Sequence, residues 1–422
     1  MDYRKRLLDV EIEHRLKSKG AILIEGPKWC GKSTTARHHA HSELDLARRD
    51  ILLNTQQMLQ INVPRALRGE PPLMIDEWQE LPEIWDAVRH EVDSRGEPGQ
   101  FILTGSAVPS QQQPHHSGAG RYAWLRMRTM ALYESGESTG EISLAHLFQN
   151  NLKGVFTNPL DLSHLCFLIS RGGWPATLFM DPEEALEQAY DYLDAIVRED
   201  VIRVDGVKRA SERIKRTLRA YSRHQGAQVA IRTLRDDIKP SEASTLDEET
   251  VSKDLDALRK IFVIEDSPAW NPNLRSKSAI RTSPTRYFTD PSIAVAALGI
   301  GPKDLESDLN TLGLLFETMC IRDLRVYAQA LKGEVLHYRD SDGLECDAVI
   351  HLRNGDYGLV EVKLGGQSWI DSAAENLLTL EQKIDATKMK APAFKLVLIG
   401  VGPNGYQRPD GVYVVPIGCL KD

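Results

Sequence analysis

The sequence of 422 residues predicts an α/β protein with three domains. Three short apolar strands end in glycine or polar residues near positions 25, 76 and 105, which is typical of a parallel sheet with its functional groups at one edge. Helical spacing dominates residues 183–261, and two strands around a turn follow between residues 345 and 363. We therefore expect a parallel-sheet domain at residues 1–165, a helical domain at 166–300 and a second α/β domain at 301–422.

Composition limits the class of protein. Hydrophobic residues make up 41% and charged residues 27%, as in an ordinary globular chain. The formal net charge of −8 argues against a protein that coats nucleic acid without specificity. No apolar run approaches the roughly 18 residues of a membrane span, and the charged N-terminal segment lacks the apolar centre of a signal peptide. Because the five cysteines are scattered without CxxC spacing, we expect reduced thiols in a cytoplasmic protein with no membrane partner.

Residues 26–34 read GPKWCGKST, which is a complete P-loop. An apolar strand precedes it and a helix is predicted from Lys32 onward. The backbone N–H groups of such a loop cradle the phosphates of ATP or ADP, Lys32 would reach the β- and γ-phosphates, and Ser33 would bind Mg²⁺. The expected nucleotide-binding residues are Gly26, Pro27, Lys28, Trp29, Cys30, Gly31, Lys32, Ser33 and Thr34.

A second motif, PPLMIDE at residues 71–77, predicts a buried strand that ends in two carboxylates. We expect Asp76 to hold the Mg²⁺ shell and Glu77 to act as the general base toward the attacking water. The alternative is that both acids begin a capped helix.

The third strand, QFILTGSA at residues 100–107, is expected between the other two in the sheet. Thr104 and Ser106 at its tip would then sense the γ-phosphate, although a simple strand-end turn explains them as well. Residues 51–54 (ILLN) are the candidate for an additional strand.

A polar, Gly-rich loop follows and includes His115 and His116, which we interpret as solvated residues. Arg121, Arg126 and Arg128 come next. We select Arg121 as a candidate arginine finger that neutralises γ-phosphate charge, and the alternative is an ordinary surface arginine.

These motifs, together with MRTMALYESGES at residues 127–138 and RGGWP at 171–175, resemble a large prokaryotic family. Its members are known as AAA-type ATP-binding proteins with a C-terminal domain of unknown function. The resemblance covers nearly the whole chain and implies ATP binding and hydrolysis without an established biological role. Thr129 and Ala131 stand where relatives more often carry Pro and Ser, and neither is a phosphate-contact position.

The middle of the chain predicts three helices and a β-wing over residues 217–273, the order of a winged helix. The third helix, at residues 247–261, carries several acids, which DNA phosphates would repel. Residues 267–286 carry four basic residues and no acid: Arg275, Lys277, Arg281 and Arg286. DNA contact through this basic wing is one expectation, and domain packing or protein contact is the other.

The last domain brings a lysine and three acids into one pattern. Glu317 lies on the apolar stripe of a helix, and a turn at Asn354 sets Asp347 opposite Glu361 and near Lys363. This pattern resembles the PD-(D/E)xK nuclease core. The resemblance implies that Asp347 and Glu361 bind Mg²⁺, that Lys363 orients the water, and that Glu317 is the helix acid. The alternative is a solvated strand face with alternating charges.

The expected function is that of an Mg²⁺-dependent ATPase whose nucleotide state controls a nucleic-acid-facing, nuclease-like module. The alternative is an ATP-dependent protein-interaction switch with an inactive nuclease-like domain. Expected partners are ATP or ADP, DNA or a protein, and a second copy of the chain.

Overall fold

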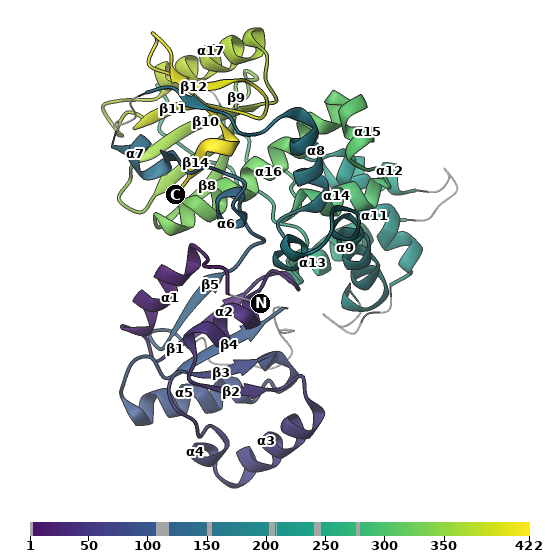
Figure 1. Ribbon diagram of the computed structural model, residues 1–422, viewed down its shortest axis with the longest axis vertical. Helices are drawn as coiled ribbons and strands as arrows, with labels where there is room; N and C mark the ends of the chain where they lie inside the picture. The colour runs from purple at the N-terminus through teal and green to yellow at the C-terminus, as the bar shows by residue number, and fades with distance from the viewer. Residues whose placement is uncertain are drawn as a thin grey trace. The chain divides into compact units, whose positions relative to one another are not determined.

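The structure is a computed structural model, and it describes residues 3–106, 118–149, 154–201, 207, 209–239, 246–275 and 279–422. The chain forms two compact units (Figure 1). The first unit comprises Met1–Thr129, Glu199–Lys208 and Ala257–Phe262, and the second comprises Met130–Arg198, Arg209–Asp256 and Val263–Asp422. The three expected domains, with boundaries at 165 and 300, stay a prediction.

The first unit contains a five-stranded parallel sheet with the order β2-β3-β4-β1-β5. The strands are β1 (Ala21–Glu25), β2 (Ser42–Asp45), β3 (Leu73–Asp76), β4 (Phe101–Gly105) and β5 (Tyr122–Arg126). Strand β4 lies between β1 and β3, as the sequence predicted. The additional strand is β2, so its assignment to residues 51–54 was wrong. Those residues lie in α3 (Arg49–Ile61), where Ile51 and Leu52 are partly buried against the core of the sheet.

Helices cover both faces of this sheet. The cluster on one face joins Ile22 and Ile24 of β1 to residues of α1 (Leu8–Leu16) and α2 (Lys32–His39). The cluster on the other face joins Ala21 and Leu23 to residues that lie both before and after β3 in the chain. Its helices are α3, α4 (Val63–Ala66), the 3₁₀ turn η1 (Trp78–Glu80) and α5 (Ile84–Arg95). Because strand side chains alternate between faces, β1 contributes to both cores of a three-layer α/β arrangement.

The second unit begins with short elements and continues with a helical part. These elements are α6 (Leu132–Ser135), β6 (Ile142–Ser143), α7 (Leu144–Phe148), β7 (Phe156–Thr157), α8 (Leu162–Arg171), the 3₁₀ turn η2 (Pro175–Phe179), α9 (Pro182–Ala195), the π turn η3 (Ile196–Asp200), α11 (Ser211–Arg223), α12 (Ile231–Ile238), α13 (Glu248–Lys260), α14 (Pro291–Leu298) and α15 (Pro302–Ser307). Residues beyond Arg198 in η3 and beyond Asp256 in α13 belong to the first unit. After α13, single antiparallel bridges join Ile264 to Phe288 and Ser267 to Thr285. The helices and this pair of segments follow the expected order, and their assignment as a winged helix stays a prediction.

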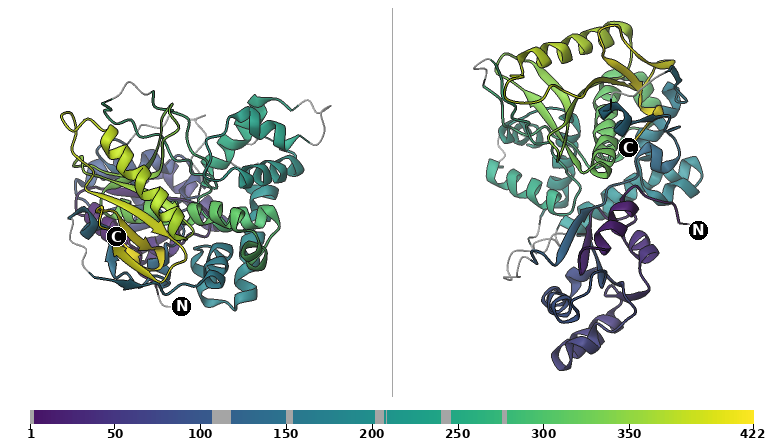
Figure 2. Two further views of the ribbon diagram at one scale, coloured as in Figure 1. Left: turned by 90° about the horizontal axis from the view of Figure 1, so that it is seen from above. Right: turned by 90° about the vertical axis from the view of Figure 1, so that its left-hand side faces the viewer.

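The rest of the second unit is built on a mixed seven-stranded sheet with the order β7-β12-β13-β11-β10-β9-β8. The elements are α16 (Leu309–Ala330), β8 (Gly333–Arg339), β9 (Glu345–Leu352), β10 (Tyr357–Lys363), α17 (Gln367–Lys383), β11 (Phe394–Ile399), β12 (Asn404–Gln407), β13 (Tyr413–Pro416), the 3₁₀ turn η4 (Ile417–Cys419) and β14 (Leu420–Lys421). Helix α17 lies along one face of this sheet (Figure 2), and Ala373 and Leu377 pack against Leu359 and Val397. None of the helices in the described part of the chain is long and apolar enough to cross a membrane.

Candidate functional site

The P-loop connects the end of β1 to the start of α2. Gly31 has φ 102° and Trp29 has φ 65°, so two positions of the loop adopt conformations that favour glycine. A Cβ atom on Gly26 would lie 2.0 Å from the carbonyl oxygen of Met127, and only glycine fits there. Gly26 and Gly31 therefore allow the backbone conformation of the loop, which a larger residue would prevent.

Lys32 is buried at the start of α2, and its ammonium group is held inside the loop. The Nζ atom donates hydrogen bonds to the carbonyl oxygens of Gly26 at 3.0 Å and Pro27 at 2.8 Å. The loop therefore holds a positive charge on the path that phosphate oxygens would take.

One carboxylate oxygen brings the three sequence motifs together. Asp76 Oδ1, at the end of β3, accepts a hydrogen bond from Ser33 Oγ at 2.9 Å and a second one from Thr104 Oγ1 at the tip of β4. These residues meet because the carboxyl ends of neighbouring parallel strands lie at the same edge of a sheet. The predicted Mg²⁺ ligands Ser33 and Asp76 are thus direct neighbours.

Glu77 follows Asp76 in a left-handed conformation, with φ 52° and ψ 47°. Its Oε2 atom accepts hydrogen bonds from Ser106 Oγ, at 3.3 Å, and from Gln79 Nε2. A left-handed residue other than glycine costs roughly 1–3 kcal/mol and is often found where function requires it. The predicted general base is therefore held beside the predicted metal ligands.

The structure does not bring Arg121 to this site. Arg121 precedes β5, so it lies at the opposite edge of the parallel sheet, and its Nε is 2.7 Å from Asp93 Oδ1. Arg126, at the other end of β5, is adjacent to Glu25, with Nη2 2.8 Å from Glu25 Oε1. The position of an arginine along a parallel strand, rather than its order in the chain, indicates which one lies near the P-loop edge.

Two further groups touch the P-loop and were not found from the sequence. Arg6 donates from Nη1 to the carbonyl oxygen of Cys30 and from Nη2 to that of Arg128, both at 2.9 Å. Lys28 Nζ lies 2.5 Å from Oδ1 of Asp200, a buried residue of the first unit. Both contacts join residues far apart in the sequence, and no motif signals them.

The predicted acids and lysine of the last domain do converge. The hairpin register pairs Ala348 with Val360, which sets Asp347 opposite Glu361. Lys363 Nζ lies 2.6 Å from Glu361 Oε2 and 3.2 Å from Asp347 Oδ2. The Tyr287 hydroxyl donates to Glu317 Oε1 at 2.5 Å.

Burial determines the charge of this cluster. Desolvation, and then the charge of Asp347, raise the pKa of Glu317 to about 8 and that of Glu361 well above its usual value. Burial alone would lower the pKa of Lys363, but the two carboxylates beside it outweigh burial and raise it. At neutral pH Glu317 therefore binds a proton, and Lys363 forms ion pairs with Asp347 and Glu361.

The basic wing is partly buried. Arg286 Nη1 lies 2.9 Å from Asp266 Oδ2 inside the fold, and both Arg275 and Arg281 have exposed side chains. The backbone N–H of Arg281 donates to the carbonyl oxygen of Arg339 in β8, at 2.9 Å. Lys277, like His115 and His116, lies outside the described residues. Two of the four cations of the predicted wing are therefore exposed.

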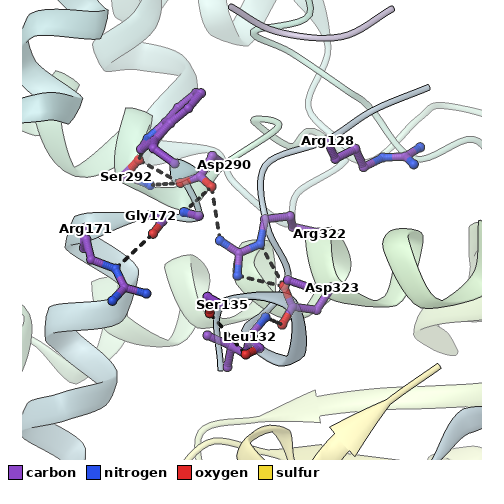
Figure 3. A network of polar contacts seen from close by, with 12 residues as sticks. Arg128, Leu132, Ser135, Arg171, Gly172, Asp290, Ser292, Arg322 and Asp323 are labelled. Carbon is purple, nitrogen blue, oxygen red and sulfur yellow. Dashed lines mark hydrogen bonds and ion pairs between the residues drawn. The ribbon is translucent and has the colours of Figure 1, made fainter. Parts of the chain in front are cut away.

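The RGGWP motif takes part in a buried polar network (Figure 3). Asp290 Oδ2 accepts hydrogen bonds from the backbone N–H of Gly173 at 3.0 Å and from Arg322 Nη1 at 3.1 Å. Arg322 Nη2 lies 2.7 Å from Asp323 Oδ1, and all three charged side chains are almost fully buried. The motif therefore takes part in the packing of the second unit.

Comparison with known proteins assigns three segments of the chain. Residues 18–135 match the AAA domain family, and residues 312–420 match a domain of unknown function, DUF4143. Residues 162–304 match another domain of unknown function, DUF8612. The chain thus combines a P-loop ATPase domain of the AAA class with a DUF4143 domain.

Two uncharacterized proteins, from Mycobacterium bovis and Mycobacterium tuberculosis, are each 24% identical over 357 residues, which is 81% of this chain and 70% of theirs. Among solved structures, a Walker-type ATPase of Pyrococcus abyssi gives a TM-score of 0.42 at 15% identity, over 68% of this chain and 94% of that one. A signal-transduction ATPase with a tetratricopeptide-repeat sensor from Pyrococcus horikoshii gives 0.24 at 13% identity, over 76% of this chain and 48% of that one. Both TM-scores are too low to support any inference about this chain.

Proposed function

We propose that this protein binds ATP at residues 26–34 and hydrolyses it. The observation that carries the proposal is the meeting of Ser33, Asp76 and Thr104 around one carboxylate oxygen, with Ser33 Oγ 2.9 Å from Asp76 Oδ1. A P-loop hydroxyl beside a strand-end carboxylate is the arrangement that P-loop NTPases use for Mg²⁺. Glu77, the next residue, places a base at the same edge.

The residues fit Mg²⁺. This ion prefers oxygen ligands and is usually held by one or two carboxylates together with substrate phosphates and water. No group of three or more His, Cys, Asp or Glu side chains in the described ranges is arranged to hold a metal, and a P-loop site needs none, because Ser33 and Asp76 supply its protein ligands. The ion, when bound, would neutralise charge that develops on the transferred phosphoryl group.

The remaining steps belong to residues of the chain. The loop N–H groups bind the phosphates, and Lys32 moves its hydrogen bonds from the carbonyls of Gly26 and Pro27 to phosphate oxygens. Glu77 accepts the proton of the attacking water. Thr104 orients Asp76 through its hydroxyl.

We further propose that nucleotide state switches a protein-interaction surface, and that the nuclease-like cluster is inactive. Lys363 contacts both Glu361 and Asp347, and Glu317 is bonded to Tyr287, so each group already has a partner within the fold. One observation favours an active nuclease as the second candidate. Glu361 Oε1 is buried and accepts no hydrogen bond from the described residues, and a cation would satisfy it.

Nucleotide binding is tested by equilibrium titration of ATP with wild type and Lys32→Ala. Lys19→Ala is the matched control, because Lys19 is a partly exposed lysine of the same unit whose ammonium group donates to the Gly120 carbonyl oxygen at 3.2 Å. Loss of affinity in Lys32→Ala alone supports the proposal, and equal affinity in all three proteins contradicts it.

The inactive cluster is tested with linear, circular and branched DNA in the presence of Mg²⁺ or Mn²⁺ and ATP. The proteins compared are wild type, Asp347→Asn and the control Asp356→Asn. Asp356 lies in the turn of the same hairpin, and its side chain forms an ion pair with Lys390. We expect no cleavage by any of them. Cleavage that Asp347→Asn abolishes and Asp356→Asn retains would establish the nuclease instead.

A further inference from the structure

We infer that Gln79 is a positioning residue, which holds the Glu77 carboxylate in place for ATP hydrolysis. The inference rests on the proposed ATPase function and adds a residue to it that the motifs do not include.

The contacts of Glu77 fix one of its two carboxylate oxygens. Strand β3 ends at Asp76, and the 3₁₀ turn η1 brings the side chain of Gln79 back toward Glu77. Gln79 Nε2 and Ser106 Oγ both donate to Glu77 Oε2, the second at 3.3 Å. Within the described part of the chain Oε1 accepts no hydrogen bond. One oxygen is therefore anchored while the other is available to take a proton from water.

The two donors differ in strength. The Ser106 contact is long for a hydrogen bond between a hydroxyl and a carboxylate, whose usual separation is about 2.5–2.7 Å. Gln79 is therefore the closer of the two donors to the carboxylate. Without it, the side chain of Glu77 would rotate about its terminal torsion with little resistance.

The tip of β4 is shaped to admit the Gln79 amide. A Cβ atom on Gly105 would lie 2.8 Å from Gln79 Oε1 and 3.0 Å from Trp78 Nε1. Any larger residue at position 105 would displace the amide from its place beside Glu77. The position of the Gln79 amide thus explains why a glycine follows Thr104 at the end of β4.

The Gln79 amide is also partly unsatisfied. Gln79 Oε1 is buried, and in the described ranges it has no hydrogen-bond partner. An unpaired buried amide oxygen costs roughly 1–3 kcal/mol, which offsets what the Nε2 hydrogen bond to Glu77 contributes to stability. A role that uses the Nε2 donor explains why a costly side chain occupies the position.

The predicted consequence is a loss of turnover without a loss of binding. A misplaced base lowers the rate of the chemical step, and a displacement of about 1 Å costs up to ~10²-fold. We expect Gln79→Ala to lower kcat by roughly 10- to 100-fold, with KM and the ATP dissociation constant within about twofold of wild type.

The experiment measures steady-state hydrolysis and equilibrium ATP binding in the full chain. Gln79→Glu is a second variant of the same size, in which a carboxylate replaces the donor and repels Glu77, so a loss of folding in Gln79→Ala does not block the test. Gln56→Ala is the matched control. Gln56 is an exposed glutamine on α3, and its side chain donates to Glu83 Oε1 at 3.4 Å. We expect this control to behave as wild type.

Reduced kcat in both Gln79 variants with unchanged binding supports the inference. A kcat within twofold of wild type, or a parallel loss of kcat and ATP affinity, overturns it. The variant Glu77→Gln distinguishes a failure of the Gln79 inference from a failure of the proposed ATPase function. Hydrolysis that is lost in Glu77→Gln and kept in Gln79→Ala overturns the inference alone, whereas a wild-type protein that does not hydrolyse ATP overturns the proposed function and the inference together.

Discussion

Replacing Glu317 with glutamine should remove a pH-dependent loss of stability. Burial and the Asp347 charge raise the pKa of Glu317 from 4.5 to about 8. In the unfolded chain the carboxyl group titrates normally, so between these two values the folded state binds more protons and stability falls as pH rises. The contribution of Glu317 to the free energy of unfolding is fully present below pH 4.5 and is lost as the pH rises to about 8. The difference of about 3.5 (8 − 4.5) corresponds to at most about 5 kcal/mol.

Glu317→Gln keeps an oxygen that accepts the Tyr287 hydroxyl hydrogen bond and carries no charge at any pH. Urea unfolding at about pH 5 and pH 8.5, followed by circular dichroism, measures the effect. We expect the variant to gain roughly 2–5 kcal/mol relative to wild type on going from the lower to the higher pH. Glu375→Gln, an exposed change on α17, is the control and should gain almost nothing. An equal pH dependence in wild type and Glu317→Gln would refute the argument.

Two further changes test the packing of the second unit. Arg322→Met leaves two buried carboxylates without their cation and should lower the free energy of unfolding by about 3–5 kcal/mol. The control Arg232→Met removes an exposed ion pair, 4.0 Å from Asp236, and should lower it by less than about 0.5 kcal/mol. Thermal unfolding of both variants measures the difference. A similar loss in both would contradict the role of the network. Gly173→Ala places a Cβ 2.2 Å from a backbone carbonyl oxygen and should reduce the urea midpoint sharply, whereas Gly313→Ala meets nothing within 4 Å in α16 and should stabilise by up to about 1 kcal/mol. Equal midpoints in the two glycine variants would show that the close approach is absent.

The sequence predicted those parts of the site that local patterns specify. The P-loop, the strand ending in Asp76 and the position of β4 follow from short motifs, because strand, turn and helix are contiguous there. The hairpin that sets Asp347 opposite Glu361 follows from a turn signal and the alternation of strand side chains. In both cases each motif lies within a short, contiguous stretch of the chain.

Contacts between distant segments were not predictable. Arg6 reaches Cys30, and Asp200 reaches Lys28 across 172 residues, and neither contact leaves a local signal. Arg121 was selected as the candidate arginine finger, but the parallel register of β5 puts Arg126 near the P-loop edge instead. Strand direction had to be known first.

The charge of the C-terminal cluster also required the structure. A lysine and three acids predicted a metal site, whereas burial and mutual contacts determine that Glu317 is protonated and Lys363 is engaged. The sequence shows which groups are present, and the fold sets their protonation.

Phosphate release by Glu77→Gln shows whether the P-loop site hydrolyses ATP. The isosteric change preserves the P-loop and the Ser33–Asp76 pair but removes the base. We expect ATP to bind with wild-type affinity while phosphate release in a single turnover falls by roughly 10²-fold or more. Wild-type phosphate release by Glu77→Gln would contradict the assignment of the site.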